Sequence, residues 1–177
     1  MRTFISVRLN DEALEEIKKI QNELAKSNLY EGKLTEEENL HLTLKFLGEV
    51  SEKNIEEVKQ RLKKIKLKKF KVKLGEVGVF SKEFVRIIWV KLEGVETLQK
   101  KVDKALHGLY TQEKRYMGHI TIARAKIVND KKKLFEFLNK IKVKEVEYEV
   151  KSFELMKSEL TSSGPEYSVI ENFCLKE

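Results

Sequence analysis

The sequence has very few of the residues that form cross-links or interrupt a chain. Its 177 residues include one cysteine, Cys174, and one proline. A single cysteine excludes an internal disulfide, and no cysteine cluster is present that could hold zinc. No apolar run approaches the ~20 residues that a membrane-spanning helix needs. We therefore expect a reduced, soluble protein without a membrane span.

The chain also lacks the features that would direct it elsewhere or divide it. Its first residues, MRTFISVRLN, contain no apolar core and no small-residue cleavage site, so we expect no secretory signal and a cytoplasmic location. No proline- or glycine-rich linker interrupts the sequence. At about 150 residues per domain, the length predicts one domain over residues 1–177.

Basic residues outnumber acidic ones by a small margin. Lys and Arg total 36 against 29 Asp and Glu, which gives a net charge of +7. This balance favours an anionic partner such as RNA, although the interspersed acidic residues predict that most of these charges neutralise one another at the surface. Only KKIKLKKFKVK, residues 63–73, is basic enough to form a local patch.

Apolar periodicity predicts a mixture of strands and helices. Strands are expected at 2–9, 40–47, 70–80, 84–92, 119–125, 143–156 and 167–175. Helices are expected after the N-cap residues Asn10 and Ser51, around 95–109 and at 131–140. Because helices separate some strands and tight turns join others, we predict an α+β fold with a largely antiparallel sheet.

Two of the three histidines open the same phrase, HLTL at 41–44 and HITI at 119–122. With seven threonines in the chain, this coincidence arises by chance roughly once in 200 such sequences. Side chains alternate between the faces of a strand, so His41 and Thr43 share one face, as do His119 and Thr121. If the strands lie together, two histidine–threonine pairs converge on one pocket.

Such a pocket suits chemistry at phosphorus. An imidazole with an unperturbed pKa near ~6.5 can act as general base or general acid at neutral pH. Threonine hydroxyls can donate hydrogen bonds to non-bridging phosphate oxygens. The two phrases thus offer what in-line displacement at a phosphodiester requires, but they leave open which histidine is the acid. The competing interpretation is two histidines with unrelated structural roles.

The paired phrases, 78 residues apart, resemble those of the two-histidine phosphoesterase superfamily. Within it, the chain is most similar to the bacterial and archaeal RNA 2',3'-cyclic phosphodiesterases, also called 2'-5' RNA ligases. The resemblance runs nearly from end to end. It is carried by the segments MRTFISV, ENLHLTLKFLGEV, VRIIWV, GHITIARAK and FELMKSELTSSGPEYSVIENFCL.

The resemblance implies a bilobal fold, with two antiparallel sheets related by a pseudo-twofold axis, each backed by helices, and an active-site groove between them. It also implies that His41 is the proton donor and His119 the proton acceptor. Thr43 and Thr121 would bind the substrate phosphate, and Arg124 would contact it. Strict alternation, however, places Arg124 on the face opposite His119, so this contact requires a bulge or a strand end.

Other residues near the phrases have two interpretations each. Lys45 follows the alternation of His41 and could add charge to the groove, but an exposed lysine is the simpler expectation. Arg86 is either a phosphate contact or part of an ion pair. Phe46 and Tyr167 could stack on a terminal base, as in proteins that hold single-stranded RNA, or belong to the core.

No metal or nucleotide cofactor is predicted, because no HxH, HExxH, acidic cluster or glycine-rich phosphate loop occurs. As the resemblance implies, water deprotonated by His119 would attack a cyclic phosphate while His41 protonates the departing ribose 3'-oxygen. The product is a 2'-phosphate end, and the reverse reaction would form a 2'-5' linkage. The predicted partner is RNA ending in a 2',3'-cyclic phosphate, including tRNA halves, and we expect a monomer.

Two alternative functions stay open. One is an inactive single-stranded RNA-binding module, although a binder would need cations and hydroxyls rather than two imidazoles. The other is a phosphodiesterase that acts on small cyclic nucleotides or on 2'-5' oligoadenylates.

Overall fold

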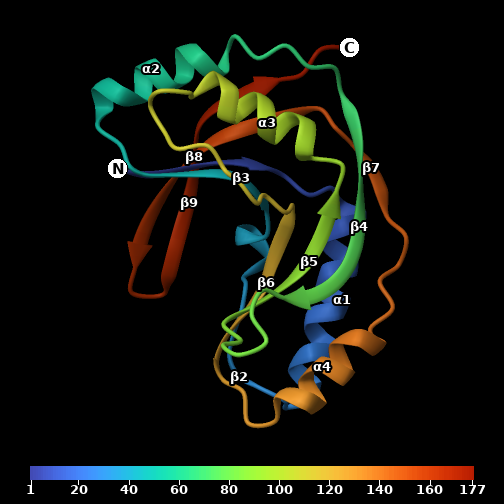
Figure 1. Cartoon of the computed structure of the whole chain (residues 1–177). Coiled ribbons are helices and arrows are strands. Elements are labelled where there is room, and N and C mark those ends of the chain that lie inside the picture. Colours follow the sequence, from blue (N-terminus) through green and yellow to red (C-terminus); the bar gives the residue numbers. More distant parts are fainter.

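Nine antiparallel strands form one curved sheet in the computed structural model, which describes residues 1–177 (Figure 1). The α+β class and the antiparallel sheet are confirmed. The strands are β1 (Arg2–Val7), β2 (Glu31–Leu34), β3 (Leu42–Glu49), β4 (Phe70–Val79), β5 (Ile87–Glu93), β6 (His119–Ile127), β7 (Glu147–Val150), β8 (Ser152–Thr161) and β9 (Gly164–Cys174). The helices are α1 (Asp11–Ser27), α2 (Glu52–Leu62), α3 (Glu96–Ala105) and α4 (Lys131–Lys140), with a 3-10 turn at Glu37–Asn39.

The strand order is nearly symmetric about its centre. It reads β7-β4-β5-β6-β3-β1-β8-β9, and β2 pairs with β6 beside this path. The central strands β6 and β3 are joined through a single pair, in which Leu42 lies opposite Ile120. Three further strands extend on each side of that pair. The two sheets expected from the sequence are therefore halves of one continuous sheet that meet at this point.

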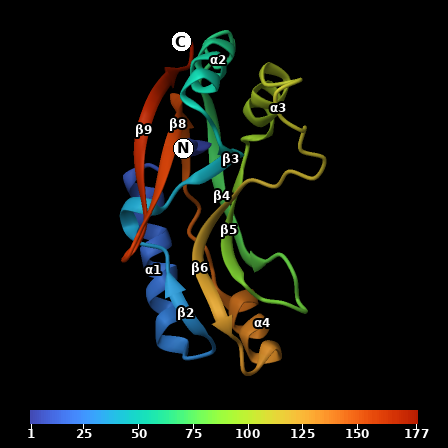
Figure 2. The same ribbon diagram turned by 90° about the vertical axis from the view of Figure 1, so that its left-hand side faces the viewer.

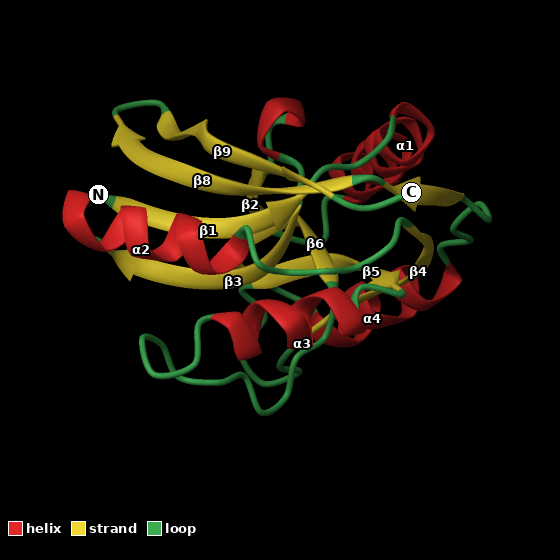
Figure 3. Cartoon of the chain, turned by 90° about the horizontal axis from the view of Figure 1, so that it is seen from above, coloured by secondary structure: helices red, strands yellow, loops and turns green.

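Two of the four helices, α1 and α3, pack on the half of the sheet that does not contain the strand before them. α1 follows β1 but packs on β6, where the amide of Gln21 donates to the carbonyl of Ile122 at 2.9 Å. α3 follows β5 but packs on β3. As a result, α2 and α3 cover one end of the molecule, and α1 and α4 cover the other (Figures 1 and 2). Figure 3 looks onto the end formed by α2 and α3. None of these helices is long and apolar enough to cross a membrane.

Side-chain caps set the beginnings of three helices. The carboxamide oxygen of Asn10 accepts the amide hydrogen of Ala13 at 2.9 Å, and the hydroxyl of Ser51 accepts that of Asn54 at 3.3 Å. Both residues were expected to be N-caps, because their short side chains satisfy an amide that has no partner in the first turn. Asp130 caps α4 in the same way.

Two expectations about strands were wrong. The long strand expected at 143–156 is two strands, because β7 pairs with β4 in one half and β8 pairs with β1 in the other. The chain changes partners at Lys151, between them. The strands expected from the sequence also did not include β2, before the 3-10 turn, whose four residues pair with β6.

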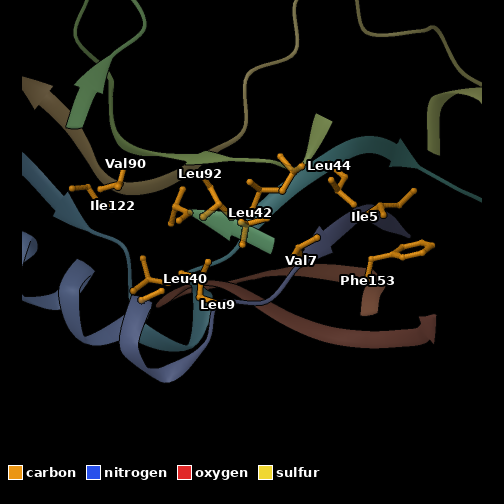
Figure 4. Packing of buried hydrophobic residues seen from close by; sticks show 14 of the residues in the cluster. Ile5, Val7, Leu9, Leu40, Leu42, Leu44, Val90, Leu92, Ile122 and Phe153 are labelled. Atoms are coloured by element: carbon orange, nitrogen blue, oxygen red, sulfur yellow. The ribbon is translucent and has the colours of Figure 1, made fainter. Parts of the chain in front are cut away.

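One hydrophobic core runs through both halves. A single cluster of 38 buried apolar residues includes the aliphatic side chains of both phrases, Leu42, Leu44, Ile120 and Ile122. Figure 4 shows Leu42 and Leu44 among the labelled side chains of this layer, with Ile5 and Val7 of β1 and Val90 and Leu92 of β5. Burying these aliphatics fixes which face of β3 and β6 the alternate residues occupy.

Candidate active site

The two phrases cross each other at the centre of the sheet. Residues paired in an antiparallel sheet point to the same side, and Leu42 and Ile120 both point into the core. Their neighbours His41, Thr43, His119 and Thr121 therefore lie together on the opposite side, which we call the histidine face. All four are partly exposed. In Figure 2 the crossing of β3 and β6 has the β8–β9 hairpin on one side and the β4–β5 loop on the other.

Both imidazoles are held in the same way. The Nδ1 atom of His41 lies 2.7 Å from the carbonyl oxygen of Asn39, and that of His119 lies 3.0 Å from the carbonyl oxygen of Met117. A carbonyl oxygen can only accept, so Nδ1 carries a proton in both rings. This leaves Nε2 as the atom that gains or loses a proton on the histidine face.

The two Nε2 atoms have different surroundings. Nε2 of His41 lies 2.9 Å from the hydroxyl oxygen of Thr43. If this nitrogen is protonated it donates to the hydroxyl oxygen, which leaves the hydroxyl hydrogen free for a phosphate oxygen. Nε2 of His119 forms no corresponding bond with Thr121, so its lone pair is open to solvent or substrate.

Aromatic rings pack against both histidines. The ring of His41 lies against Phe4, with centroids 4.9 Å apart, and edge-on to Tyr167 at 5.3 Å. The ring of His119 lies edge-on to Phe80 at 4.7 Å. These contacts exclude water from one side of each imidazole.

Burial lowers the pKa of both histidines below the usual value. In His41 the hydrogen bond to the carbonyl of Asn39 opposes this change, and the positive charge of His119 lowers the pKa further. In His119 only the hydrogen bond to Met117 opposes the effect of burial. The charge of His119 thus acts on the titration of His41, so an apparent pKa measured at this site depends on both imidazoles.

A β-bulge at the fourth residue of each phrase changes which face the later residues occupy. In β3, Thr43 pairs with Ser6 and Lys45 pairs with Ile5, so Leu44 has no partner. In β6, Ile122 is skipped in the same way. An extra residue shifts the alternation by one position. The burial pattern along residues 41–49 is consequently identical to that along residues 119–127.

The bulge places Arg124 on the side of the histidines. Ala123 is buried against the core, whereas Arg124 is exposed, and its positive charge acts on Tyr167 beside His41. The irregularity that the sequence analysis required for a phosphate contact is therefore present. Phe46 occupies the corresponding position in β3 and is 69% exposed, so it does not belong to the core.

Lys45 differs from both interpretations offered for it. It is neither exposed nor on the histidine face, because the bulge turns it towards α3. Its ammonium group donates to the carboxylate of Asp103 at 2.5 Å and to the carbonyl of Thr111 at 2.7 Å. Burial raises the pKa of Asp103, but hydrogen bonds from Lys45, the Glu113 amide and Gln99 outweigh it and hold this pKa below its usual value. The pair anchors the chain segment that leads into β6.

The remaining residues considered from the sequence have different surroundings. Tyr167 is half-buried, with its ring against His41. Arg86 is exposed, lies just before β5 and forms no ion pair; its backbone carbonyl accepts the amide hydrogen of Ala125 at 2.8 Å. His107, the third histidine, is exposed and lies outside the histidine face.

Three residues near the histidines were missed from the sequence. The hydroxyl of Tyr116 donates to the backbone carbonyl of Thr43 at 2.9 Å, which ties the approach to β6 to β3. At Gly118 a Cβ atom would lie 2.5 Å from the carbonyl oxygen of Leu92, so only glycine allows β6 to begin this close to β5. The glycine before HITI was a signal for this, whereas nothing near Phe80 linked it to His119.

No group of three or more His, Cys, Asp or Glu side chains lies close enough together to hold a metal ion. The chain's own groups on or beside the histidine face are two imidazoles, two hydroxyls and one guanidinium. Such a set can move two protons and hold an anion. Whether the reaction proceeds without a metal stays a prediction.

The chain is similar in sequence to proteins of known name. It is 35% identical to an RNA 2',3'-cyclic phosphodiesterase of Methanocaldococcus jannaschii, in an alignment that covers 98% of this chain and 100% of that protein. It is 33% identical to a protein of the same name from Thermotoga maritima, over 96% of this chain and 93% of the relative.

Solved structures agree with the fold. The crystal structure of TT0787 of Thermus thermophilus superposes with a TM-score of 0.82 at 27% identity, covering 99% of this chain and 98% of that one. Apo LigT of Escherichia coli has a TM-score of 0.79 at 21% identity over the same shares of the two chains, which supports the fold alone.

The model of one protein family matches almost the whole chain, in two stretches. They cover residues 7–89 and 91–167, and each contains one histidine–threonine phrase and its bulge. One family accounts for the repeated strand geometry, for the names of the full-length relatives and for the match in two stretches. The chain belongs to the LigT-like phosphoesterases.

Proposed function

We propose that this protein hydrolyses the 2',3'-cyclic phosphate at the end of RNA to a 2'-phosphate. The observation that carries the proposal is the crossing of the two phrases at Leu42 and Ile120, which puts two imidazoles with outward Nε2 atoms on one face. The names of the full-length relatives support the same reaction.

The reaction follows from the two Nε2 atoms. The lone pair on Nε2 of His119 accepts a proton from water, and the water oxygen forms a bond to phosphorus. The bond between phosphorus and the ribose 3'-oxygen breaks on the opposite side, and Nε2–H of His41 donates a proton to that oxygen. A 2'-phosphate and a 3'-hydroxyl result, and the two histidines end in exchanged protonation states.

The assignment of acid and base has local support. The Thr43 hydroxyl beside His41 accepts the hydrogen of a protonated Nε2, whereas Nε2 of His119 is unoccupied by protein and open to water. Burial disfavours a charged His41 in the free protein. A bound phosphodiester carries a negative charge, which raises the pKa of a neighbouring imidazole and restores the acid.

The remaining groups of the site would hold the phosphate. The hydroxyls of Thr43 and Thr121 donate to the non-bridging oxygens, and Arg124 compensates the charge that builds up on them during attack. Such a site needs no metal, and it can run backwards to join a cyclic phosphate to an RNA 5'-hydroxyl as a 2'-5' linkage. A monomer suffices, because both phrases come from the same domain, residues 1–177.

One experiment tests the proposal and separates it from its alternatives. A short RNA ending in 2',3'-cyclic phosphate, with tRNA halves as a second substrate, is incubated with the protein in excess EDTA. Conversion to a 2'-phosphate end is expected. Binding without conversion would favour an inactive RNA-binding module, and conversion of 2',3'-cyclic AMP or 2'-5' oligoadenylate alone would favour a small-nucleotide enzyme.

A further inference from the structure

A second basic region lies away from the histidine face. A cleft of about 710 Å³ opens between α2 and α3, which we call the α2–α3 cleft. Its lining is basic on both sides and contains one carboxylate. Its charged residues are Glu57, Arg61, Lys64, Lys66, Lys101 and Lys104.

The one arginine of this cleft is already used by the protein. Arg61 donates to the carboxylate of Glu57 at 2.8 Å and to the carbonyl of His107 at 2.9 Å, which ties α2 to the end of α3. It neutralises the only acidic side chain of the lining. The four lysines of the cleft, two from each side, remain without a carboxylate within ion-pair distance.

The rest of the basic run at 63–73 does not share this property. Lys63 pairs with Glu171 at 3.4 Å, and Lys69 pairs with Glu177 at 2.5 Å. Two further lysines of the run pair with glutamates in the same way, Lys71 with Glu147 and Lys73 with Glu145. Much of the basic patch predicted from the sequence is therefore neutralised by ion pairs. Lys64 and Lys66 instead lie in the same cleft as two lysines of α3, which are distant in the sequence.

Helix dipoles alone do not account for four such lysines. A cation near the C-terminal end of a helix such as α2 or α3 is weakly favoured by the helix dipole. That effect applies to single charges and does not require them to converge on one hollow, where like charges repel. A polyanion in the cleft would turn this repulsion into attraction.

The position of the cleft excludes the cyclic phosphate itself as the occupant. α3 packs on the side of β3 that carries Lys45, and the histidines lie on the other side. The lining residues of the cleft come from α2, α3 and the chain that follows α2, and these helices form one end of the molecule (Figures 1 and 2). A ligand that reaches both places must be a chain of several phosphates.

The opposite end of the molecule, formed by α1 and α4, has a cleft that differs from the α2–α3 cleft in size and charge. A smaller cleft of about 310 Å³ lies between α1 and α4, with Lys19, Lys140 and Lys142 and the carboxylate of Glu23. It has fewer cations and less room. This cleft provides an internal control in the same protein.

We propose that the α2–α3 cleft binds the phosphate backbone of the RNA body, several nucleotides from the end that reacts at the histidine face. The inference rests on RNA as the proposed substrate. It makes Lys64, Lys66, Lys101 and Lys104 backbone contacts that affect binding of long RNA without touching the reacting atoms. Backbone contacts of this kind are independent of base sequence and sensitive to salt.

The test measures RNA affinity and needs no turnover. Fluorescence anisotropy compares a labelled 20-nucleotide RNA with a 3'-hydroxyl end and a labelled dinucleotide, for the wild type and for the double variant Lys101→Gln/Lys104→Gln. Losing two phosphate contacts should weaken binding of the 20-mer roughly tenfold at 0.15 M salt and reduce the slope of log K against log salt by about 1.4. Affinity for the dinucleotide should stay unchanged.

The matched control is Lys140→Gln/Lys142→Gln in the smaller cleft, which removes the same charge and should change the affinity for the 20-mer less than twofold. Equal losses in both variants would show a general charge effect and overturn the proposal. Unchanged affinity of Lys101→Gln/Lys104→Gln, or a loss accompanied by a lower melting temperature, would overturn it as well. Because no hydrolysis is measured, a failure here is distinct from a failure of the proposed reaction.

Discussion

The backbone has the same geometry in residues 41–49 and in residues 119–127, but the two segments carry different side chains. Both begin with a histidine whose Nδ1 atom is bonded to the carbonyl two residues earlier, and both contain a bulge at the fourth position. Beyond the bulge, however, a buried lysine corresponds to Ala123, and an exposed phenylalanine corresponds to Arg124. The backbone geometry is repeated, while the side chains are not.

In the proposed reaction, these differences give the two segments different roles. The β6 segment contributes a histidine with an unoccupied Nε2 and a cation, which suits a base and a phosphate contact. The β3 segment contributes a histidine whose Nε2 is beside Thr43 and an exposed ring, which suits an acid and a stacking surface for a base. A symmetric backbone thereby produces an asymmetric site.

The largest effect should come from removing either imidazole. We expect His41→Ala and His119→Ala each to lower kcat for a cyclic phosphate by at least ~100-fold, because a positioned acid or base contributes 10² to 10⁴-fold. Circular dichroism should show an unchanged fold. His107→Ala, which removes the exposed third histidine, should retain full activity. Wild-type turnover by His119→Ala would contradict the mechanism.

The second prediction concerns the buried charge that only the β3 segment has. Lys45→Met leaves the carboxylate of Asp103 buried without its cation, so the free energy of unfolding should fall by about 3–5 kcal/mol in urea denaturation. Lys71→Met breaks an exposed pair with Glu147 and should cost less than about 1 kcal/mol. If the two losses were equal, the anchoring role of Lys45 would be wrong.

The pH dependence of this stability has a definite sign. The folded pKa of Asp103 is lowered, so the unfolded chain binds the proton more readily. Its contribution is therefore present above the unfolded pKa of about 4 and is lost as pH falls through the lower folded value.

A third pair of variants separates Arg124 from Phe46. Arg124→Ala should lower kcat/KM roughly 10- to 100-fold on every substrate, because hydrogen bonds to charged groups contribute about 1.5–3 kcal/mol. Phe46→Ala should lower kcat/KM for a nucleoside cyclic phosphate and leave kcat/KM for an abasic ribose cyclic phosphate unchanged, since stacking needs a base. Lys132→Ala, at an exposed lysine of α4, is the surface control. A lower kcat/KM of Phe46→Ala on the abasic substrate would contradict a stacking role for Phe46.

The smallest effects should distinguish the threonines. Thr43→Val and Thr121→Val each remove one neutral donor, so we expect a loss of roughly 2- to 10-fold in kcat/KM. Thr43→Val also removes the partner of His41 Nε2 and should shift the alkaline limb of the pH–rate profile. Thr121→Val should leave that limb in place. Identical profiles for the two variants would mean that the bond to His41 has no role.

The sequence predicted the fold class and the convergence of the phrases because both depend on alternation and on one repeated motif. It was wrong for Lys45, because the bulge at Leu44 buries this residue, which strict alternation had placed beside His41. For Arg124 the sequence required a bulge or a strand end, and the bulge at Ile122 places Arg124 on the side of the histidines. A bulge depends on the neighbouring strand, so one strand's sequence does not reveal it.

The sequence also did not reveal which strands pair with one another in the sheet. The residues around Lys151 have the composition of a continuous strand, and only the pairing of β7 with β4 and of β8 with β1 divides them. The contacts between Lys45 and Asp103, and those that bring Lys64 near Lys101, join residues far apart in the chain. Pairs of this kind can be identified only in the folded structure, in which α3 packs on β3 and beside α2.

The most direct test of a coupled acid and base is the pH dependence of kcat/KM and kcat for wild type, His41→Ala and His119→Ala. Because burial lowers the pKa of both free histidines, the wild-type bell in kcat/KM should have its optimum below neutral pH, and bound phosphate should move the alkaline limb of kcat upwards. His119→Ala should lose the acidic limb and His41→Ala the alkaline limb. Residual activities that keep the full wild-type bell in both variants would contradict the account.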